Sequence, residues 1–283
     1  MPAFTAPDGT ELAYHLRGDG EPLLCIPGGP MRASAYLGDL GGLAAHRRLV
    51  LLDLRGTGDS QVPADPATYR VDRQVADVEA LRDHLGLDRV DLLAHSAGGD
   101  LALLYAARHP HRVRTLTLIT ARARALGVDF TEDHRREAAA LRESEPWFGG
   151  AYEAYERIWA GSDADADWDA IAPFFYGRWD ATARAHATAD VEQSNFEAAE
   201  EYASSGAFSP EAARAVIGKL DAPVLLLAGE LDSGPLPRVA ADIAELIPKV
   251  QLTVQPGSGH FPWLDDPQGF TRTVTAFLQV GAV

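Results

Sequence analysis

A serine at a tight strand-to-helix junction is the residue of this chain best placed to do chemistry. Residues 90–99 read V-D-L-L-A-H-S-A-G-G, so a strand-like apolar run leads directly into Ser96 and a helix-like segment follows. The run matches the G-x-S-x-G nucleophile-elbow pattern, with Ala94 in place of the first glycine. In such a turn the serine backbone is strained, and its hydroxyl stands clear of the sheet beside a helix N-terminus. The pattern predicts that Ser96 is a nucleophile.

A serine hydroxyl becomes a good nucleophile when an imidazole takes its proton and a carboxylate orients that imidazole. His260 lies in the run G-S-G-H-F-P-W, between the last strand-like segment and the last helix-like one, where such sheets place their sites. His95 is expected to point away from the serine and to pack or hydrogen-bond locally. The other histidines have contexts typical of surface positions: His15, His46, His84, His109, His111, His134 and His186.

The acid is expected at the end of the penultimate strand, where the run A-G-E-L-D offers two carboxylates. We favour Asp232 over Glu230, because Asp232 lies deeper in the loop and its side chain can reach toward His260. The expected triad is therefore Ser96, Asp232 and His260.

An oxyanion hole needs two backbone N–H groups near the nucleophile. One is expected from Ala97, directly after the serine. The other is expected from the loop I-P-G-G-P at 26–30, whose glycines let the backbone approach a ligand closely. Gly29 is the first choice for that donor, and Gly28 is expected to lie against the substrate. The alternative interpretation of this loop is a simple turn.

The elements that must position these residues alternate between strand-like and helix-like segments through the first 120 residues. Short apolar runs predict buried strands, and apolar residues at helical spacing from 71 to 85 and from 97 to 108 predict the helices between them. Such alternation is typical of an α/β protein with a mostly parallel central sheet flanked by helices. The expected buried strands are 22–27, 49–54, 90–94 and 115–119, preceded by a hairpin turn at Asp8-Gly9. The strand pattern resumes at 222–228 and 250–254.

Residues from about 121 to 215 interrupt this alternation, because they are rich in Ala, Glu, Arg and aromatic residues without a clear strand pattern. We interpret this stretch as a helical insertion. Its acidic run at 163–167 resembles the start of a calcium loop. It lacks the glycine and glutamate that an EF-hand needs at its sixth and twelfth positions, so a solvated acidic loop is expected. No metal site is expected.

The formal net charge of −16 argues against nucleic acid or an anionic membrane surface as a partner. The one cysteine, Cys25, lies in an apolar run and is expected to be a buried thiol. No apolar run approaches the roughly 20 residues of a membrane span, and the N-terminal residues have no apolar signal core. A cytoplasmic protein is the simplest expectation.

The blocks P-G-G-P, D-L-R-G-T-G-D-S, A-H-S-A-G-G, G-E-L-D and G-H-F-P-W, in this order, resemble the α/β-hydrolase superfamily. The resemblance implies a core of residues 1–120 and 216–283 with a helical cap at 121–215. It also implies acyl-enzyme chemistry at Ser96 without a cofactor. In that family the D-x-R-G-x-G-x-S block shapes a loop, so Asp53 and Arg55 are given no catalytic role.

Within the superfamily the chain is most similar to proline-iminopeptidase-like serine hydrolases. Those enzymes usually carry H-G-G-P-G at the oxyanion loop and a tryptophan after the serine. This chain has Pro27, Met31 and Ala97 at the corresponding positions. Members of the family hold the substrate's free amine with glutamates on the cap, and Glu192 is the expected match, although a glutamate-rich helix is also typical of a solvated face.

The leading expectation for function is a serine hydrolase of the proline iminopeptidase type acting on a short peptide or another small molecule. An esterase or lactonase acting on a small-molecule ester is the alternative. Two other classes remain open on this scaffold: a ligand-binding protein without turnover, and an enzyme of non-hydrolytic chemistry. Dehalogenases and epoxide hydrolases of this fold are disfavoured, because their nucleophile is a carboxylate.

Overall fold

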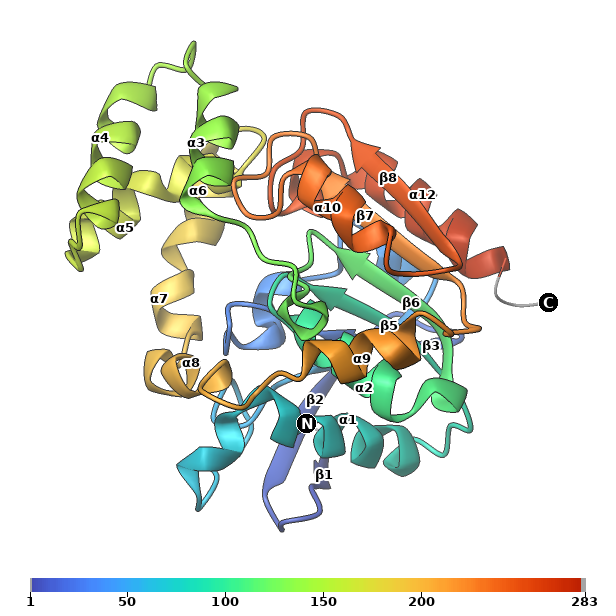
Figure 1. Cartoon of the computed structure of the whole chain (residues 1–283). Coiled ribbons are helices and arrows are strands. Elements are labelled where there is room, and N and C mark those ends of the chain that lie inside the picture. Colours follow the sequence, from blue (N-terminus) through green and yellow to red (C-terminus); the bar gives the residue numbers. More distant parts are fainter. Residues whose placement is uncertain (1, 281–283) are drawn as a thin grey trace.

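An eight-stranded sheet forms the centre of the structure, in the order β1-β2-β4-β3-β5-β6-β7-β8 (Figure 1). The computed structural model describes residues 2–280. The strands from β4 to β8 are parallel, and β1 and β2 are antiparallel to their neighbours. The expected α/β class with a mostly parallel sheet is confirmed. The strands are β1 (Ala3–Thr5), β2 (Glu11–Arg17), β3 (Pro22–Ile26), β4 (Arg48–Leu52), β5 (Val90–His95), β6 (Val113–Ile119), β7 (Val224–Gly229) and β8 (Val250–Gln255).

The central strands are mostly apolar because helices cover both of their faces. Every residue of β5 and β7 is buried. Alternate side chains enter two different hydrophobic clusters: Leu92 belongs to the cluster on one face, and Leu93 to the cluster on the other. Burial on both faces fixes the register of these strands, because a shift by one residue would move every side chain to the opposite face. Since the strands are parallel, their carboxyl ends meet at one edge of the sheet.

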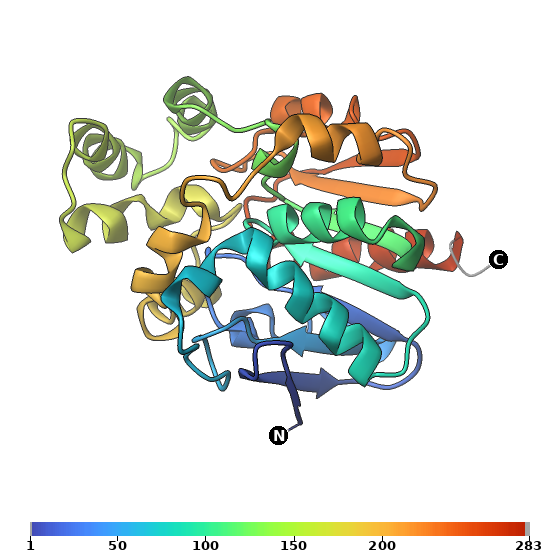
Figure 2. The same ribbon diagram turned by 60° about the horizontal axis from the view of Figure 1, so that its bottom comes forward.

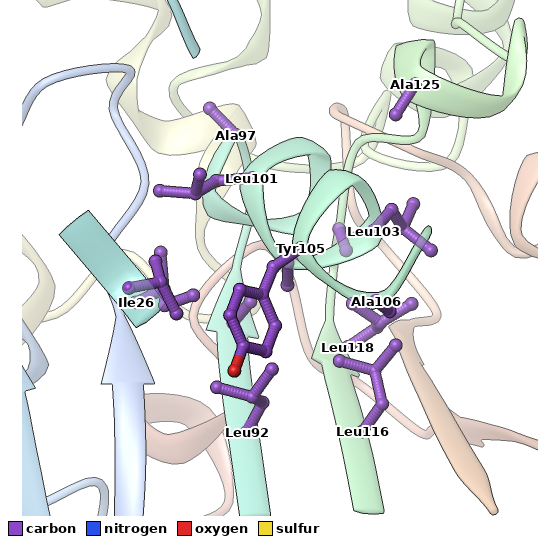
Figure 3. Packing of buried hydrophobic residues seen from close by; sticks show 14 of the residues in the cluster. Ile26, Leu92, Ala97, Leu101, Leu103, Tyr105, Ala106, Leu116, Leu118 and Ala125 are labelled. Carbon is purple, nitrogen blue, oxygen red and sulfur yellow. The ribbon is translucent and has the colours of Figure 1, made fainter. Parts of the chain in front are cut away.

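The helices divide between the two faces (Figure 2). Residues of α1, α2, α9 and α10 join the cluster that contains Leu92, whereas α12 joins the other. Figure 3 shows α2 packed on β5 and β6, with Tyr105 and Ala106 on the helix side of Leu92 and Leu116. Within residues 2–280 no helix has the length and apolar character needed to cross a membrane. These helices are α1 (Val71–His84), α2 (Gly98–Arg108), α9 (Pro210–Ile217), α10 (Pro237–Ala244) and α12 (Pro267–Val280).

The chain between β6 and β7 is helical in the described structure. Its helices α3 to α5 stand away from the sheet in Figures 1 and 2 and have their own hydrophobic cluster around Tyr155 and Phe174. The division of the chain into a core and a cap domain remains a prediction. These helices are α3 (Glu132–Ala140), α4 (Phe148–Trp159), α5 (Asp165–Ile171), α6 (Ala181–Thr188), α7 (Asp190–Gln193) and α8 (Phe196–Tyr202), with 3-10 turns at Arg124–Leu126 and Ala172–Phe175.

The acidic run at 163–167 differs from the solvated loop expected there. Helix α5 begins at Asp165, so acidic side chains occupy its first turn, where they favour the helix dipole. Asp167 is buried and accepts hydrogen bonds from Arg157 Nε, at 2.8 Å, and Ser162 Oγ, at 2.6 Å. The run therefore starts a helix.

Candidate active site

Ser96 lies immediately after β5, in the turn that leads to α2. Its φ of 52° is in the left-handed region, which a residue with a side chain adopts at an energetic cost. The turn is held by three bonds of the Ser96 backbone: its N–H donates to the carbonyl of Ile119 at 3.1 Å, and its carbonyl accepts from Gly99 N and Arg122 N, both at 2.9 Å. A Cβ at Gly98 would lie 2.4 Å from the carbonyl oxygen of Pro27. The glycine of the motif is therefore required by close packing against the loop after β3.

Asp232 and His260 are brought together by the loops that follow β7 and β8. Both carboxylate oxygens of Asp232 lie 3.0 Å from His260 Nδ1. The Gly234 amide donates to Oδ1 of the same carboxylate at 2.7 Å. Asp232 is fully buried, and His260 is 8% exposed, so water has little access to this pair. An imidazole held through Nδ1 keeps Nε2 for a reacting group.

Glu230, the alternative acid, has a different position. Its side chain is exposed, and its Oε2 accepts the backbone N–H of Gly257 at 2.7 Å. It thus holds the turn after β8, whereas Asp232 contacts the histidine.

The glycine loop after β3 packs directly against the nucleophile. A Cβ at Gly28 would lie 2.7 Å from Ser96 Cβ and 3.3 Å from Ala97 N. The Gly28 amide donates to the Tyr36 hydroxyl at 2.7 Å, so the amide of Gly29 is the next donor along the loop. Gly29 has a φ of 117°, a conformation that favours glycine. The loop and the Ala97 amide are therefore neighbours, as an oxyanion hole requires.

Tyr36, which the sequence patterns did not single out, forms a buried hydrogen-bonded pair with His95 next to these loops. Tyr36 Oη lies 2.7 Å from His95 Nδ1, and His95 Nε2 lies 2.8 Å from the carbonyl oxygen of His260. Burial, and secondarily the neighbouring His260, holds the pKa of His95 well below its usual value. Burial also raises the pKa of Tyr36. Both groups are therefore neutral near pH 7. His95 does bond locally, as expected.

The helical segment from α6 to α8, in the chain between β6 and β7, is attached to the glycine loop through Arg32. The Arg32 side chain is buried. Its guanidinium donates to Gln193 Oε1 at 2.8 and 2.9 Å and to the His186 carbonyl at 3.1 Å, and it pairs with Asp190 at 2.9 Å. Two backbone bonds add to this contact: Ala33 N donates to the Gln193 carbonyl, and Asn195 N to that of Met31.

His186 differs from the surface position expected for it. It is only partly exposed, and its Nδ1 lies 2.8 Å from Tyr176 Oη while its Nε2 lies 3.2 Å from the Tyr36 carbonyl oxygen. Burial, together with the Arg32 charge, lowers its pKa to about 4.

Glu192, the expected amine anchor, lies on α7 with its side chain exposed. The neighbouring acid on that helix, Asp190, is paired with Arg32. The acidic side chains of α8 are exposed at Glu197 and Glu200, and Glu201 accepts a hydrogen bond from Ser204. The structure therefore does not bring Glu192 together with Ser96 as a buried pair.

One group of potential metal ligands is present among residues 2–280: His15, Asp53 and Asp59. The Asp53 carboxylate already accepts hydrogen bonds from Ser34 N, Ser34 Oγ and Asp59 N. Asp53 Oδ2 also lies 2.9 Å from His15 Nε2. These contacts tie the chain after β3 to the loop after β4. Arg55 likewise pairs with buried Asp77 and with Asp8.

Comparisons with known proteins agree with this architecture. Residues 21–267 match the model of the alpha/beta hydrolase fold family. The chain belongs to the α/β-hydrolase family. The resemblance seen in its motifs is thereby confirmed.

Relatives of known name include both peptidases and esterases. The chain is 26% identical to a proline iminopeptidase of Levilactobacillus brevis over 93% of this chain and 90% of that one. Among solved structures, a proline iminopeptidase of Mycobacterium smegmatis superimposes with a TM-score of 0.75 at 24% identity, covering 99% of this chain and 98% of that one. A thermophilic esterase of Thermogutta terrifontis does so with a TM-score of 0.70 at 23% identity, covering 100% and 99%. At this identity the two structures establish the fold alone.

Proposed function

We propose that this α/β-hydrolase is a serine hydrolase that acts by acyl transfer. The observation that carries the proposal is the contact of Asp232 with His260 Nδ1 at 3.0 Å, in loops at the same sheet edge as the strained Ser96. A buried carboxylate in this position fixes the imidazole tautomer with its proton on Nδ1, which leaves Nε2 as the base.

In the proposed reaction, Ser96 Oγ attacks the substrate carbonyl carbon while His260 Nε2 takes the hydroxyl proton. The carbonyl oxygen becomes an oxyanion, which the amides of Gly29 and Ala97 stabilise together with the N-terminus of α2. His260 then returns the proton to the leaving alcohol or amine, and an acyl-enzyme remains. A water molecule, deprotonated by His260, cleaves that ester and restores Ser96.

A small uncharged ester is the substrate class that the site geometry favours. An aminopeptidase must compensate the charge of a free α-amine, and a carboxylate does this best when it is desolvated near the reacting carbonyl. Here Glu192 is exposed and Asp190 is paired with Arg32. An ester of a neutral acyl group needs no such anchor.

Aminopeptidase activity is the second candidate. It is supported by the similarity of nearly the whole chain to the Levilactobacillus brevis proline iminopeptidase and by the position of Glu192 on the segment tied to the glycine loop. Glu192 is the anchor on this proposal.

A fluorophosphonate probe tests the reaction class, and a substrate panel tests the choice between the two candidates. The wild type is expected to be labelled and Ser96→Ala to remain unlabelled, and labelling that persists in Ser96→Ala contradicts the proposal. Short p-nitrophenyl esters are expected to be hydrolysed faster than prolyl and alanyl p-nitroanilides. The opposite preference, with anilide turnover reduced in Glu192→Gln and not in Glu200→Gln, would establish the peptidase instead.

A further inference from the structure

A continuous chain of hydrogen bonds connects the glycine loop to the loop of the proposed base. The Gly28 amide donates to Tyr36 Oη at 2.7 Å, Tyr36 Oη lies 2.7 Å from His95 Nδ1, and His95 Nε2 lies 2.8 Å from the His260 carbonyl oxygen. Tyr36 is 5% exposed and His95 2% exposed. Water therefore does not compete for these bonds.

The direction of each bond follows from the chemistry of its groups. A carbonyl oxygen only accepts, so His95 carries its proton on Nε2 and donates it to His260. The Nδ1 of this neutral ring then has only a lone pair, so it accepts the Tyr36 hydroxyl proton. Tyr36 Oη in turn accepts the Gly28 amide proton. Each of these three polar contacts has one donor and one acceptor, and the chain runs in one direction.

Three positions along this chain of hydrogen bonds lie one residue or less from a proposed catalytic group. Gly28 precedes the Gly29 amide, His95 precedes Ser96, and the His260 carbonyl belongs to the base itself. We propose, on the basis of the acyl-transfer function above, that Tyr36 and His95 are positioning residues that hold the oxyanion donor, the nucleophile and the base in mutual register. His95 also packs against the His260 ring, with ring centroids 4.8 Å apart. Neither Tyr36 nor His95 makes or breaks a bond in the proposed reaction.

The structure contains a second tyrosine–histidine pair, with a buried tyrosine and a partly buried histidine, that serves as a control. Tyr176 Oη lies 2.8 Å from His186 Nδ1, and His186 Nε2 lies 3.2 Å from the Tyr36 carbonyl oxygen. Tyr176 is as buried as Tyr36, at 2% exposed. This second pair has the same chemistry but ties the helical segment to the turn at Ser34–Leu37 (η1) rather than to His260.

The test compares Tyr36→Phe with Tyr176→Phe in hydrolysis of a p-nitrophenyl ester. Both variants keep the aromatic ring and lose one buried hydroxyl. Tyr36→Phe also leaves the Gly28 amide without its acceptor, so its fall in Tm is expected to be the larger of the two. Tyr36→Phe is expected to lower kcat at least tenfold with KM changed less than threefold, because small misplacements of reacting groups act on the transition state. Tyr176→Phe is expected to keep kcat within twofold of wild type. Retention of wild-type kcat by Tyr36→Phe, or equal losses in both variants, would overturn the proposal.

Substitutions of His95 provide an independent measurement if Tyr36→Phe does not fold. Gln places an amide nitrogen near the position of Nε2 and so retains the donor to the His260 carbonyl, whereas Leu retains neither bond. His95→Gln is expected to keep at least fivefold more kcat than His95→Leu at similar Tm. Equal kcat in the two variants contradicts the positioning role. If fluorophosphonate labelling survives Ser96→Ala, the proposed function itself fails. An unaffected Tyr36→Phe in an enzyme that Ser96→Ala inactivates contradicts only this inference.

Discussion

Asp232 contacts His260 through both carboxylate oxygens, each 3.0 Å from Nδ1. One of these oxygens, Oδ1, also accepts the Gly234 amide proton at 2.7 Å. A Cβ at Gly234 would lie 3.0 Å from both Asp232 Oδ1 and His260 Nδ1. The Asp232 carboxylate is therefore held by a backbone donor that bonds the same oxygen, Oδ1, that also contacts the His260 imidazole.

This arrangement predicts the effect of Asp232→Asn. The Gly234 amide keeps the asparagine oxygen as its acceptor, so the amide nitrogen faces Nδ1 and donates to it. His260 is then forced to carry its proton on Nε2 and cannot accept the Ser96 proton. We expect kcat for ester hydrolysis to fall about 10⁴-fold with little change in fold. Glu230→Gln is the control, and it should leave kcat unchanged, whereas a larger loss in that variant would reverse the assignment of the acid.

The sequence predicted the parts of the fold and site that depend on local pattern. The buried strands appear as apolar runs because both of their faces are covered, and Ser96 and Asp232 follow two such runs. His260 follows β8, an edge strand whose residues are mostly exposed or partly buried, so its place was indicated by strand pattern and not by burial. Tyr36 and Arg32 were not predictable in this way. Their partners are 59 and 161 residues away in the chain, and no local motif specifies such contacts. The surface assignment of His186 was wrong for the same reason, because residues of distant segments cover it.

The attachment of the helical segment at Arg32 is expected to control its local stability. Arg32→Met gives an apolar side chain of similar length and removes the charge-assisted hydrogen bonds to the partly buried Gln193, which are worth about 1.5–3 kcal/mol. Amide hydrogen exchange at 186–195 should accelerate roughly ten- to a hundredfold, while β5 and β6 keep their protection. Arg73→Met, which alters an exposed arginine, is the control. Unchanged exchange at 186–195 would show that the backbone bonds alone hold the segment.

The partly buried His186 predicts a loss of stability in mild acid. Its pKa is lowered to about 4 in the folded chain by burial and by Arg32, compared with 6.5 for an exposed histidine. The unfolded chain therefore binds more protons between these values, and stability falls as the pH falls from about 6.5 to about 4.

His186→Gln removes this titration and retains a donor for the Tyr36 carbonyl. Between pH 7 and pH 5 the wild type should lose about 2 kcal/mol more unfolding free energy than the variant, measured by urea denaturation. His95 titrates in the same direction in both proteins, so the variant keeps a residual pH dependence. Parallel pH profiles would mean that His186 has an ordinary pKa in the folded protein.

The contact between the glycine loop and the nucleophile predicts a large effect of one methyl group. Gly28 does not have a positive φ, so its backbone conformation does not exclude alanine. The effect of the substitution therefore depends on the room available for the added methyl group. The new Cβ would lie 2.7 Å from Ser96 Cβ and 2.8 Å from the His95 carbonyl oxygen, so the loop or the nucleophile must shift. We expect Gly28→Ala to lower kcat by roughly 100-fold and to destabilise the fold by about 1–3 kcal/mol.

Gly149→Ala is the matched control, because a Cβ at that position of α4 meets nothing within 4 Å. It should leave kcat unchanged and raise stability by about 0.5–1 kcal/mol through helix propensity. Wild-type kcat in Gly28→Ala would show that the loop does not lie against Ser96 in the working enzyme. The Gly29 amide would then no longer be placed to stabilise the oxyanion, and the second donor would have to come from another part of the site.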